Sequence, residues 1–233
     1  MKLSIVIPCY NEEKNIPLIL ERFKETINRD DIEVVLVNNG STDNTAQVLE
    51  ELLPRYTFVN VCFVPINKGY GYGILQGLKM CKGQYIGWSH ADMQTDPKDV
   101  LKALLLIEDS KDPNVFIKGN RRNRPLFDQI FTIGMSIFET LYLKEKLVDI
   151  NAQPNIFPKS FFDTWENPPY DFSLDLYVFY LATVRKLKII RFRVLFPKRI
   201  YGKSSWNDGF RAKWKFIKRT IEFSVKLKKG GIK

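Results

Sequence analysis

Residues 33–43 read Glu33-Val34-Val35-Leu36-Val37-Asn38-Asn39-Gly40-Ser41-Thr42-Asp43, an apolar run that passes through a polar turn into a helix-capping group. The apolar run predicts a buried strand, and Gly40 permits a tight turn after it. Thr42 or Asp43 can cap a helix that runs to about Leu53. A strand joined to a helix by so short a turn is the repeating unit of parallel sheets.

The same unit recurs along the first hundred residues. Apolar runs at 3–8, 58–64 and 84–88 predict three more strands, and 11–28 and 70–81 predict helices between them. Strands and helices that alternate in this way favour right-handed crossovers and an α/β fold with a mostly parallel sheet flanked by helices.

The second half of the chain is expected to extend the same domain. Its pattern predicts a helix near 127–144, an irregular region over 151–169, a helix from Leu174 and a strand over 189–196. We therefore expect one domain over residues 1–205. Residues 206–233 form a basic amphipathic helix that either belongs to the same unit or lies at a membrane interface.

Composition is that of a globular protein, with 45% apolar and 27% charged residues. The three cysteines, Cys9, Cys62 and Cys81, lie in or beside apolar runs and are expected to be reduced, which favours a cytoplasmic location. We expect no signal peptide and no membrane-spanning helix, because the most apolar helical segment is interrupted by charges.

The net charge of +10 is concentrated at one end of the chain, because residues 185–233 alone carry a net +15. A stripe of apolar residues runs along the last predicted helix: Phe210, Trp214, Ile217, Ile221 and Val225. Basic amphipathic helices of this kind lie on anionic membrane surfaces. The alternative is that the stripe packs on the domain and the lysines are merely solvated. No nucleic-acid docking motif accompanies the charge, so nucleic acid is not an expected partner.

Polar loops follow three of the predicted strands, at residues 8–13, 38–43 and 90–94, and a glycine-containing turn lies at 67–73. In open α/β sheets, ligands bind where the carboxyl ends of the strands meet, so these loops should converge on one crevice.

The third of these loops contains the chain's only histidine, His90, followed by Asp92 and Gln94. Two side chains that are two residues apart on an extended backbone point to the same side, and together they offer oxygens to a hard divalent cation. Asp96 and Pro97 are typical of a helix N-cap followed by the first helical residue.

On these motifs the sequence resembles family 2 of the inverting glycosyltransferases, which have the nucleotide-sugar-binding GT-A fold. The resemblance lies in residues 4–12, 37–43, 67–69 and 91–94. Within the family the chain looks most like the dolichyl- or polyprenyl-phosphate sugar transferases. Lys118-Gly119-Asn120-Arg121 and Arg199-Ile200-Tyr201-Gly202-Lys203-Ser204 resemble later motifs of that branch.

The resemblance implies a role for each matching residue. Asp92 and Gln94 would bind Mg²⁺ or Mn²⁺, and Asp92, Asp175 and Arg199 would be the catalytic residues. Arg121 and Arg124 would bind the acceptor. The nucleotide sugar would be bound by a larger set, which is Pro8, Tyr10, Glu12, Asn38, Asn39, Asp43, Asn67, Gly69, His90, Ala91, Asp92 and Lys203.

Two positions depart from the family pattern. His90 stands where the metal motif usually begins with aspartate, which removes a negative charge. Asn38 and Asn39 stand where two aspartates are usual, and an amide can donate a hydrogen bond as well as accept one.

The implied function is metal-dependent, inverting transfer of a sugar from a UDP-, GDP- or dTDP-linked donor to a polyprenyl phosphate or lipid-linked glycan, at the inner face of a membrane. An ionised phosphate acceptor needs no strong base. Extension of an envelope polysaccharide through a sugar hydroxyl would need one, with Asp175 the first candidate and Asp149 the second. The alternative of another class is a catalytically silent nucleotide-sugar-binding protein. The oligomeric state is left open.

Overall fold

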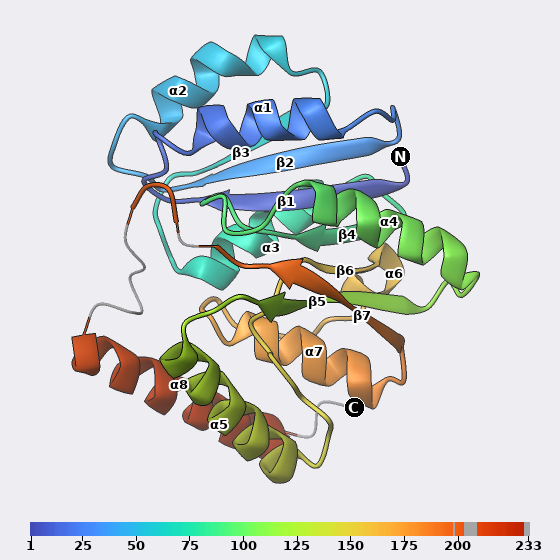
Figure 1. Cartoon of the computed structure of the whole chain (residues 1–233), viewed down its shortest axis with the longest axis vertical. Helices are drawn as coiled ribbons and strands as arrows, with labels where there is room; N and C mark the ends of the chain where they lie inside the picture. Colours follow the sequence, from blue (N-terminus) through green and yellow to red (C-terminus); the bar gives the residue numbers. More distant parts are fainter. Residues whose placement is uncertain (198, 203–208, 231–233) are drawn as a thin grey trace.

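The central element is a seven-stranded sheet with the strand order β3-β2-β1-β4-β6-β5-β7 (Figure 1). The computed structural model describes residues 1–197, 199–202 and 209–230. Within them the strands are β1 Leu3–Cys9, β2 Ile32–Asn39, β3 Val59–Val64, β4 Tyr85–Trp88, β5 Val115–Arg122, β6 Asn155–Pro158 and β7 Lys188–Leu195.

The direction of the strands determines where the polar loops lie. Every neighbouring pair is parallel except those of β6, which runs antiparallel to both β4 and β5. The carboxyl ends of the six parallel strands therefore lie at one edge of the sheet. Asn155 begins β6 at this same edge, opposite Trp88 of β4 and Lys118 of β5.

Helices cover both faces of the sheet, because each contributes an apolar face to one of two cores. Helices α1, α2 and α4 contribute to the first core, and α3 and α7 to the second. The helices are α1 Ile16–Thr26, α2 Thr45–Leu52, α3 Tyr70–Met80, α4 Lys98–Ser110, α5 Leu126–Leu143, α6 Lys159–Phe162, α7 Leu174–Val184 and α8 Gly209–Gly230, with a 3₁₀ turn at Leu53–Arg55.

The predicted α/β architecture is confirmed, but two local predictions are wrong. Helix α1 begins at Ile16 rather than at residue 11, because Asn11 has a left-handed φ of 56° and its side chain accepts a hydrogen bond from the Thr42 backbone N–H. The region 151–169 is not irregular, because it contains β6 and α6. Strand β6 is only four residues long and ends in Pro158, so it has too little pattern to be recognised.

Helices α5 and α8 lie side by side at the end of the molecule opposite α1 and α2 (Figure 1). The Ser224 hydroxyl of α8 contacts both carboxyl oxygens of Glu139 on α5, at 2.8 and 2.7 Å, and Arg219 pairs with Asp171 at 3.3 Å. Helix α8 thus packs on the same body as the sheet, and the predicted boundary at 205/206 lies outside the described residues.

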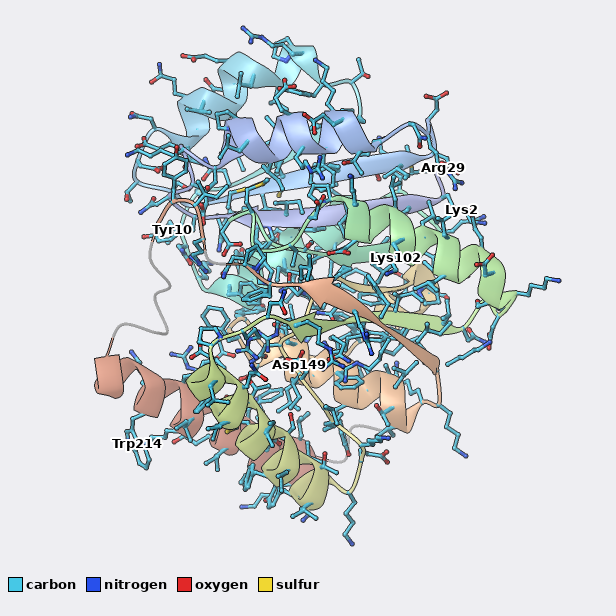
Figure 2. All side chains as sticks on the ribbon, in the orientation of Figure 1. Lys2, Tyr10, Arg29, Lys102, Asp149 and Trp214 are labelled. Carbon is cyan, nitrogen blue, oxygen red and sulfur yellow. The ribbon has the colours of Figure 1, made fainter. Side chains whose placement is uncertain are left out.

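Helix α8 does not pack against the rest of the molecule through the predicted stripe. Ser224 and Leu227 are buried, whereas Trp214 and Ile221 from the stripe are 60% and 36% exposed. Figure 2 shows Trp214 pointing away from the rest of the molecule. Of the other stripe residues, Ile217 and Val225 are half-buried, and the Phe210 side chain lies outside the description. Part of the apolar stripe is therefore exposed.

Candidate functional site

The loops after β1 and β2 are locked together at the carboxyl edge of the sheet. The Glu12 backbone N–H donates to the Thr45 hydroxyl at 2.9 Å, and the Glu13 N–H donates to Asp43 Oδ2 at 3.3 Å. The N-cap residue of α2 is Asn44 rather than the predicted Thr42 or Asp43, but Asp43 Oδ1 accepts the N–H of Thr45, the first helical residue, at 3.0 Å. Both Asp43 oxygens thus hold the loops in place, while Tyr10 remains 48% exposed beside them.

The turn at 67–69 is fixed against the end of β2. Asn39 Nδ2 donates to the Gly69 carbonyl at 3.1 Å, and Asn67 Oδ1 accepts the Gly69 N–H at 2.9 Å. Gly69 has a φ of 122°, and a Cβ there would lie 2.3 Å from the Tyr170 carbonyl oxygen. This position therefore requires glycine.

Asn38 and Asn39 do not act as one pair. Successive residues of a strand face opposite sides of the sheet, and Asn39 lies against Gly73 of α3. Asn38 Oδ1 accepts the Ser41 N–H at 3.1 Å, whereas Asn39 Oδ1 is buried without a hydrogen-bond partner among the described residues. The two amides must therefore serve different contacts.

The backbone between Asp92 and Gln94 is not extended, contrary to the prediction, because Met93 has a left-handed φ of 59°. The two side-chain oxygens nevertheless converge. Asp92 Oδ2 lies 2.8 Å from Arg199 Nη2, and Gln94 Oε1 accepts from Arg199 Nε at 3.0 Å. One cationic group is therefore held between the two predicted metal ligands.

This geometry fits a divalent cation, since a guanidinium already occupies the position that both oxygens face. Carboxylate and amide oxygens are suitable ligands for Mg²⁺ or Mn²⁺, but two side chains fill only part of a six-coordinate shell. Within the described ranges, no cluster of three or more His, Cys, Asp or Glu side chains could hold a metal. Further ligands would have to come from phosphate oxygens and water.

Glu12 contributes a carboxyl group to the same edge. Its burial raises its pKa, and the nearby Asp92 adds to this effect, while Asn15 and Arg199 oppose it. The Asn15 amide donates to Glu12 Oε2 at 2.5 Å. Glu12 therefore interacts electrostatically with both Asp92 and Arg199.

Asp96 lies just before α4, whose N-cap is Pro97 rather than the predicted Asp96. Its Oδ1 accepts the Lys98 N–H at 2.9 Å, and Pro97 already has helical dihedral angles, with a φ of −47°. Ala91, by contrast, is only 4% exposed and packs in the first hydrophobic core, so its side chain does not face the edge.

The arginines predicted to bind the acceptor lie at the end of β5 and just beyond it. Arg121 donates to Asp149 from its backbone N–H and from Nε, both at 2.9 Å. Arg124 donates to the Thr132 hydroxyl at 2.8 Å and lies 4.0 Å from Asp149. Burial would raise the pKa of Asp149, but Arg121 outweighs this and keeps it low. Asp149 is therefore an ionised partner of Arg121 and a poor candidate for a base.

A cavity of about 540 Å³ opens beside these arginines, between β5 and α5. Arg121, Arg122 and Arg124 line part of it, and the remaining wall includes Ile133 and Ile137. Its apolar wall continues into a stripe on α5 whose members are between 55% and 74% exposed: Leu126, Ile130, Ile133, Ile137 and Leu141.

Phe196 connects the arginines to the metal motif. The His90 ring lies edge-on to the Phe196 ring at 5.8 Å, and the guanidinium carbons of Arg121 and Arg124 lie 5.3 and 5.9 Å from its centre. Burial lowers the pKa of His90, against the opposing effect of Asp92. His90 Nε2 is buried and has no hydrogen-bond partner among the described residues.

Asp175 lies in a closed network and is 2% exposed. It accepts a hydrogen bond from Asn155 Nδ2 at 2.8 Å, and Asn155 Oδ1 accepts from Lys118 Nζ at 2.7 Å. Lys118 also donates to the carbonyls of Ile150 and Ala152, at 2.7 and 2.9 Å. Burial raises the pKa of Asp175 and lowers that of Lys118, and each charge partly offsets the shift of the other.

Sequence reasoning missed Lys118, Asn155 and Phe196. One signal was available, because Lys118 interrupts the apolar run Val115-Phe116-Ile117 of a buried strand. A lysine in that position must find acceptors. The predicted residue Lys203 lies outside the described residues.

An open α/β sheet with interlocked polar loops at the carboxyl ends of its parallel strands is the arrangement in which nucleotide-binding α/β proteins hold their ligands. Residues 4–176 match the family described as Glycosyl transferase family 2. The chain belongs to this family, as the sequence predicted.

Curated relatives agree with the predicted branch. The chain is 36% identical over 130 residues to undecaprenyl-phosphate 4-deoxy-4-formamido-L-arabinose transferase of Pseudomonas fluorescens. This match covers 53% of this chain and 37% of the relative. The enzyme of the same name from Proteus mirabilis is 32% identical over 127 residues, covering 53% and 38%. The match thus spans little more than a third of each relative.

Solved structures confirm the GT-A fold. Glucosyl-3-phosphoglycerate synthase from Mycobacterium tuberculosis, in complex with Mn²⁺, uridine diphosphate and phosphoglyceric acid, superposes with a TM-score of 0.75 at 14% identity, covering all of this chain and 79% of that one. The same enzyme with Mg²⁺ and uridine diphosphate gives a TM-score of 0.69 at 13% identity, covering 97% and 78%.

The network around Lys118 predicts a large stability effect. Lys118→Met leaves three acceptors unpaired and removes the cation near Asp175, so we expect a loss of about 3–5 kcal/mol in the free energy of unfolding. The pKa of Asp175 is already raised in the fold and would rise further. The loss should therefore grow as pH rises from about 5 to about 8.

Chemical denaturation at the two pH values measures this effect. Lys159→Met is the matched control, because the Lys159 side chain is 39% exposed and forms a surface ion pair with Asp163 at 3.1 Å; it should change stability by less than about 0.5 kcal/mol. Equal unfolding free energies for the two variants would contradict the network.

Proposed function

We propose that this protein is a metal-dependent, inverting glycosyltransferase that moves a sugar from a nucleotide-sugar donor to a polyprenyl phosphate or lipid-linked glycan. The observation that carries the proposal is that the Phe196 ring contacts both His90 and Arg121. His90 belongs to the loop that contains Asp92 and Gln94, and Arg121 lines the cationic, partly apolar cavity, so the metal motif and the cavity are neighbours. A donor site and an amphiphile site at such close range are what this transfer requires.

On the donor side, Asp92 and Gln94 would hold Mg²⁺ or Mn²⁺. The bound cation would offset the charge of the departing nucleoside diphosphate. Arg199 would leave the two oxygens and donate to phosphate oxygens instead, a contact for which a planar guanidinium is well suited. The uridine diphosphate complexes of the structural relatives make a UDP-linked sugar the first donor to test.

On the acceptor side, the buried state of Asp175 favours a phosphate over a hydroxyl nucleophile. A hydroxyl acceptor needs a reachable base, whereas Asp175 is 2% exposed and bound to Asn155. An acceptor phosphate is already ionised at neutral pH. The names of the curated relatives, which act on undecaprenyl phosphate, support the same class of acceptor.

The surface near the cavity suits an anionic membrane. The exposed aliphatic stripe belongs to α5, and the neighbouring helix α8 carries four exposed lysines, Lys215, Lys218, Lys226 and Lys228. Aliphatic side chains that enter the interface next to lysines that contact anionic headgroups give peripheral binding. In the part of the chain described, no helix is both long enough and apolar enough to cross a bilayer. We propose that α5 and α8 hold the protein at the cytoplasmic face of a membrane, a proposal supported by the exposed stripe and lysines.

Donor binding tests the metal site. Asp92→Ala should weaken Mn²⁺-dependent binding of UDP by more than about a hundredfold, since losing even an outer-shell partner of a metal costs 10–100-fold. Isothermal titration with and without Mn²⁺ measures this, with exposed Asp109→Ala as the control. Mn²⁺-dependent affinity that survives in Asp92→Ala would refute the site. Wild-type protein that binds UDP but transfers sugar from none of a panel of donors would favour a catalytically silent binding protein.

Asp175→Asn separates the two acceptor classes. A phosphate acceptor predicts that turnover falls less than about threefold, whereas loss of a general base costs about 10²–10⁴-fold. The assay follows radiolabelled sugar into undecaprenyl phosphate, with the unfolding midpoint recorded in parallel to confirm that the variant is folded. A hundredfold loss of turnover in a stable variant would favour a hydroxyl acceptor.

The α5 stripe predicts where the membrane binds. The double variant Ile133→Glu, Ile137→Glu should reduce partitioning onto vesicles containing phosphatidylglycerol by at least about tenfold, since each buried aliphatic side chain contributes about 1.5–3 kcal/mol. Leu105→Glu is the matched control, because Leu105 is 55% exposed on α4, away from the stripe. Co-sedimentation measures partitioning, and equal binding by both variants would exclude α5 as the contact.

A further inference from the structure

We propose that His90 recognises the acceptor's phosphate, by donating a hydrogen bond from Nε2 to one of its non-bridging oxygens. This inference rests on the proposed function, because it assumes a phosphate-bearing acceptor. It assigns the position that begins the metal motif to the acceptor rather than to the donor.

The first support is the position of the imidazole. His90 precedes Asp92 by two residues, yet its ring packs edge-on against Phe196, at an interplanar angle of 65°. The Arg121 and Arg124 guanidinium groups lie near that same aromatic ring, and Arg121 acts electrostatically on His90. The imidazole is therefore a neighbour of the cations that line the cavity.

The second support is an unmet hydrogen bond. His90 Nε2 is buried without a partner among the described residues, a state that costs free energy unless a ligand supplies the missing group. The charged neighbours do not supply it. Asp149 is engaged by Arg121, and Asp92 by Arg199 and the Gln94 N–H. An N–H at Nε2 requires an acceptor, and a phosphate oxygen is one.

The third support is the local charge. The guanidinium groups of Arg121 and Arg124 share one carboxylate, that of Asp149, so this cluster carries a net charge of +1. An aspartate at position 90 would cancel that charge and place a further anion beside the incoming phosphate. The imidazole keeps the polar contact without adding a negative charge.

The consequence is discrimination between a phosphate and an alcohol on the same lipid. A buried site built to hydrogen-bond a particular group rejects a ligand that lacks this group, because the site's own polar atoms then stay unpaired. Farnesyl phosphate and farnesol differ only in the phosphate, so they are suitable probes.

The experiment uses the full chain and three substitutions, with binding of farnesyl phosphate, farnesol and UDP with Mn²⁺ each measured by isothermal titration. His90→Leu removes the donor and should weaken farnesyl phosphate binding about tenfold, and His90→Asp, which adds a charge, by about a hundredfold. His90→Gln keeps a neutral donor and should stay within about threefold of wild type. Farnesol binding and the affinity for UDP with Mn²⁺ should change less than about threefold in all three.

Each contrary outcome is distinct. A changed affinity for UDP, or a changed Mn²⁺ requirement, with constant farnesyl phosphate binding would assign His90 to the donor or the metal and overturn the inference. If none of the affinities changes, His90 only packs on Phe196 and the inference is wrong. If wild-type protein binds UDP with Mn²⁺ but no farnesyl phosphate, the proposed acceptor class itself fails. Unfolding midpoints of the three variants establish that they are folded.

Discussion

The buried ammonium group of Lys118 ties strand β5 to the start of β6 and, through Asn155, to helix α7. Its three hydrogen bonds reach the carbonyls of Ile150 and Ala152 and the Asn155 side chain, and three such bonds require three protons on Nζ. Through Asn155 the same network reaches Asp175 on α7. The start of the reversed strand β6, which pairs with both β4 and β5, is thereby anchored to β5, on the side of the sheet where the metal motif and the β5 arginines meet.

At the edge of the sheet, two arginines are each held by a carboxylate. Arg199 pairs with Asp92, and Arg121 with Asp149. A divalent cation and Arg199 need the same oxygens of Asp92 and Gln94, so neither can bind there without displacing the other. A diphosphate resolves the competition, because it can accept the metal and the displaced guanidinium at once. This physical coupling makes donor and metal binding a joint event in the proposed reaction.

The sequence predicted the features that depend on neighbouring residues, but few of the contacts between residues that are distant in the chain. Runs of apolar residues predicted β1, β2, β3, β4 and β7, and short polar patterns predicted that Asp43 and Asp96 lie at the starts of helices, because such signals depend only on neighbouring residues. The contact of Gln94 with Arg199 spans 105 residues and leaves no local pattern. Strand β6 is defined by its two neighbours rather than by its own four residues. The reversal at Met93 was equally hidden, since a methionine does not suggest a left-handed backbone.

The contact between α5 and α8 joins a basic helix to the helix that carries the apolar stripe. Glu139 is fully buried, and burial raises its pKa to about 7. The Ser224 hydroxyl has a single proton, yet it lies within 2.9 Å of both Glu139 oxygens and the Thr220 carbonyl. A protonated carboxyl group supplies the second proton that this cluster needs. Glu139 can therefore join the helices without placing an uncompensated charge between them, and the lysines of α8 remain at the surface. The aliphatic stripe, the lysines and the mouth of the arginine-lined cavity then belong to one end of the molecule, so an amphiphile that presents its phosphate to the arginines can leave its chain along α5.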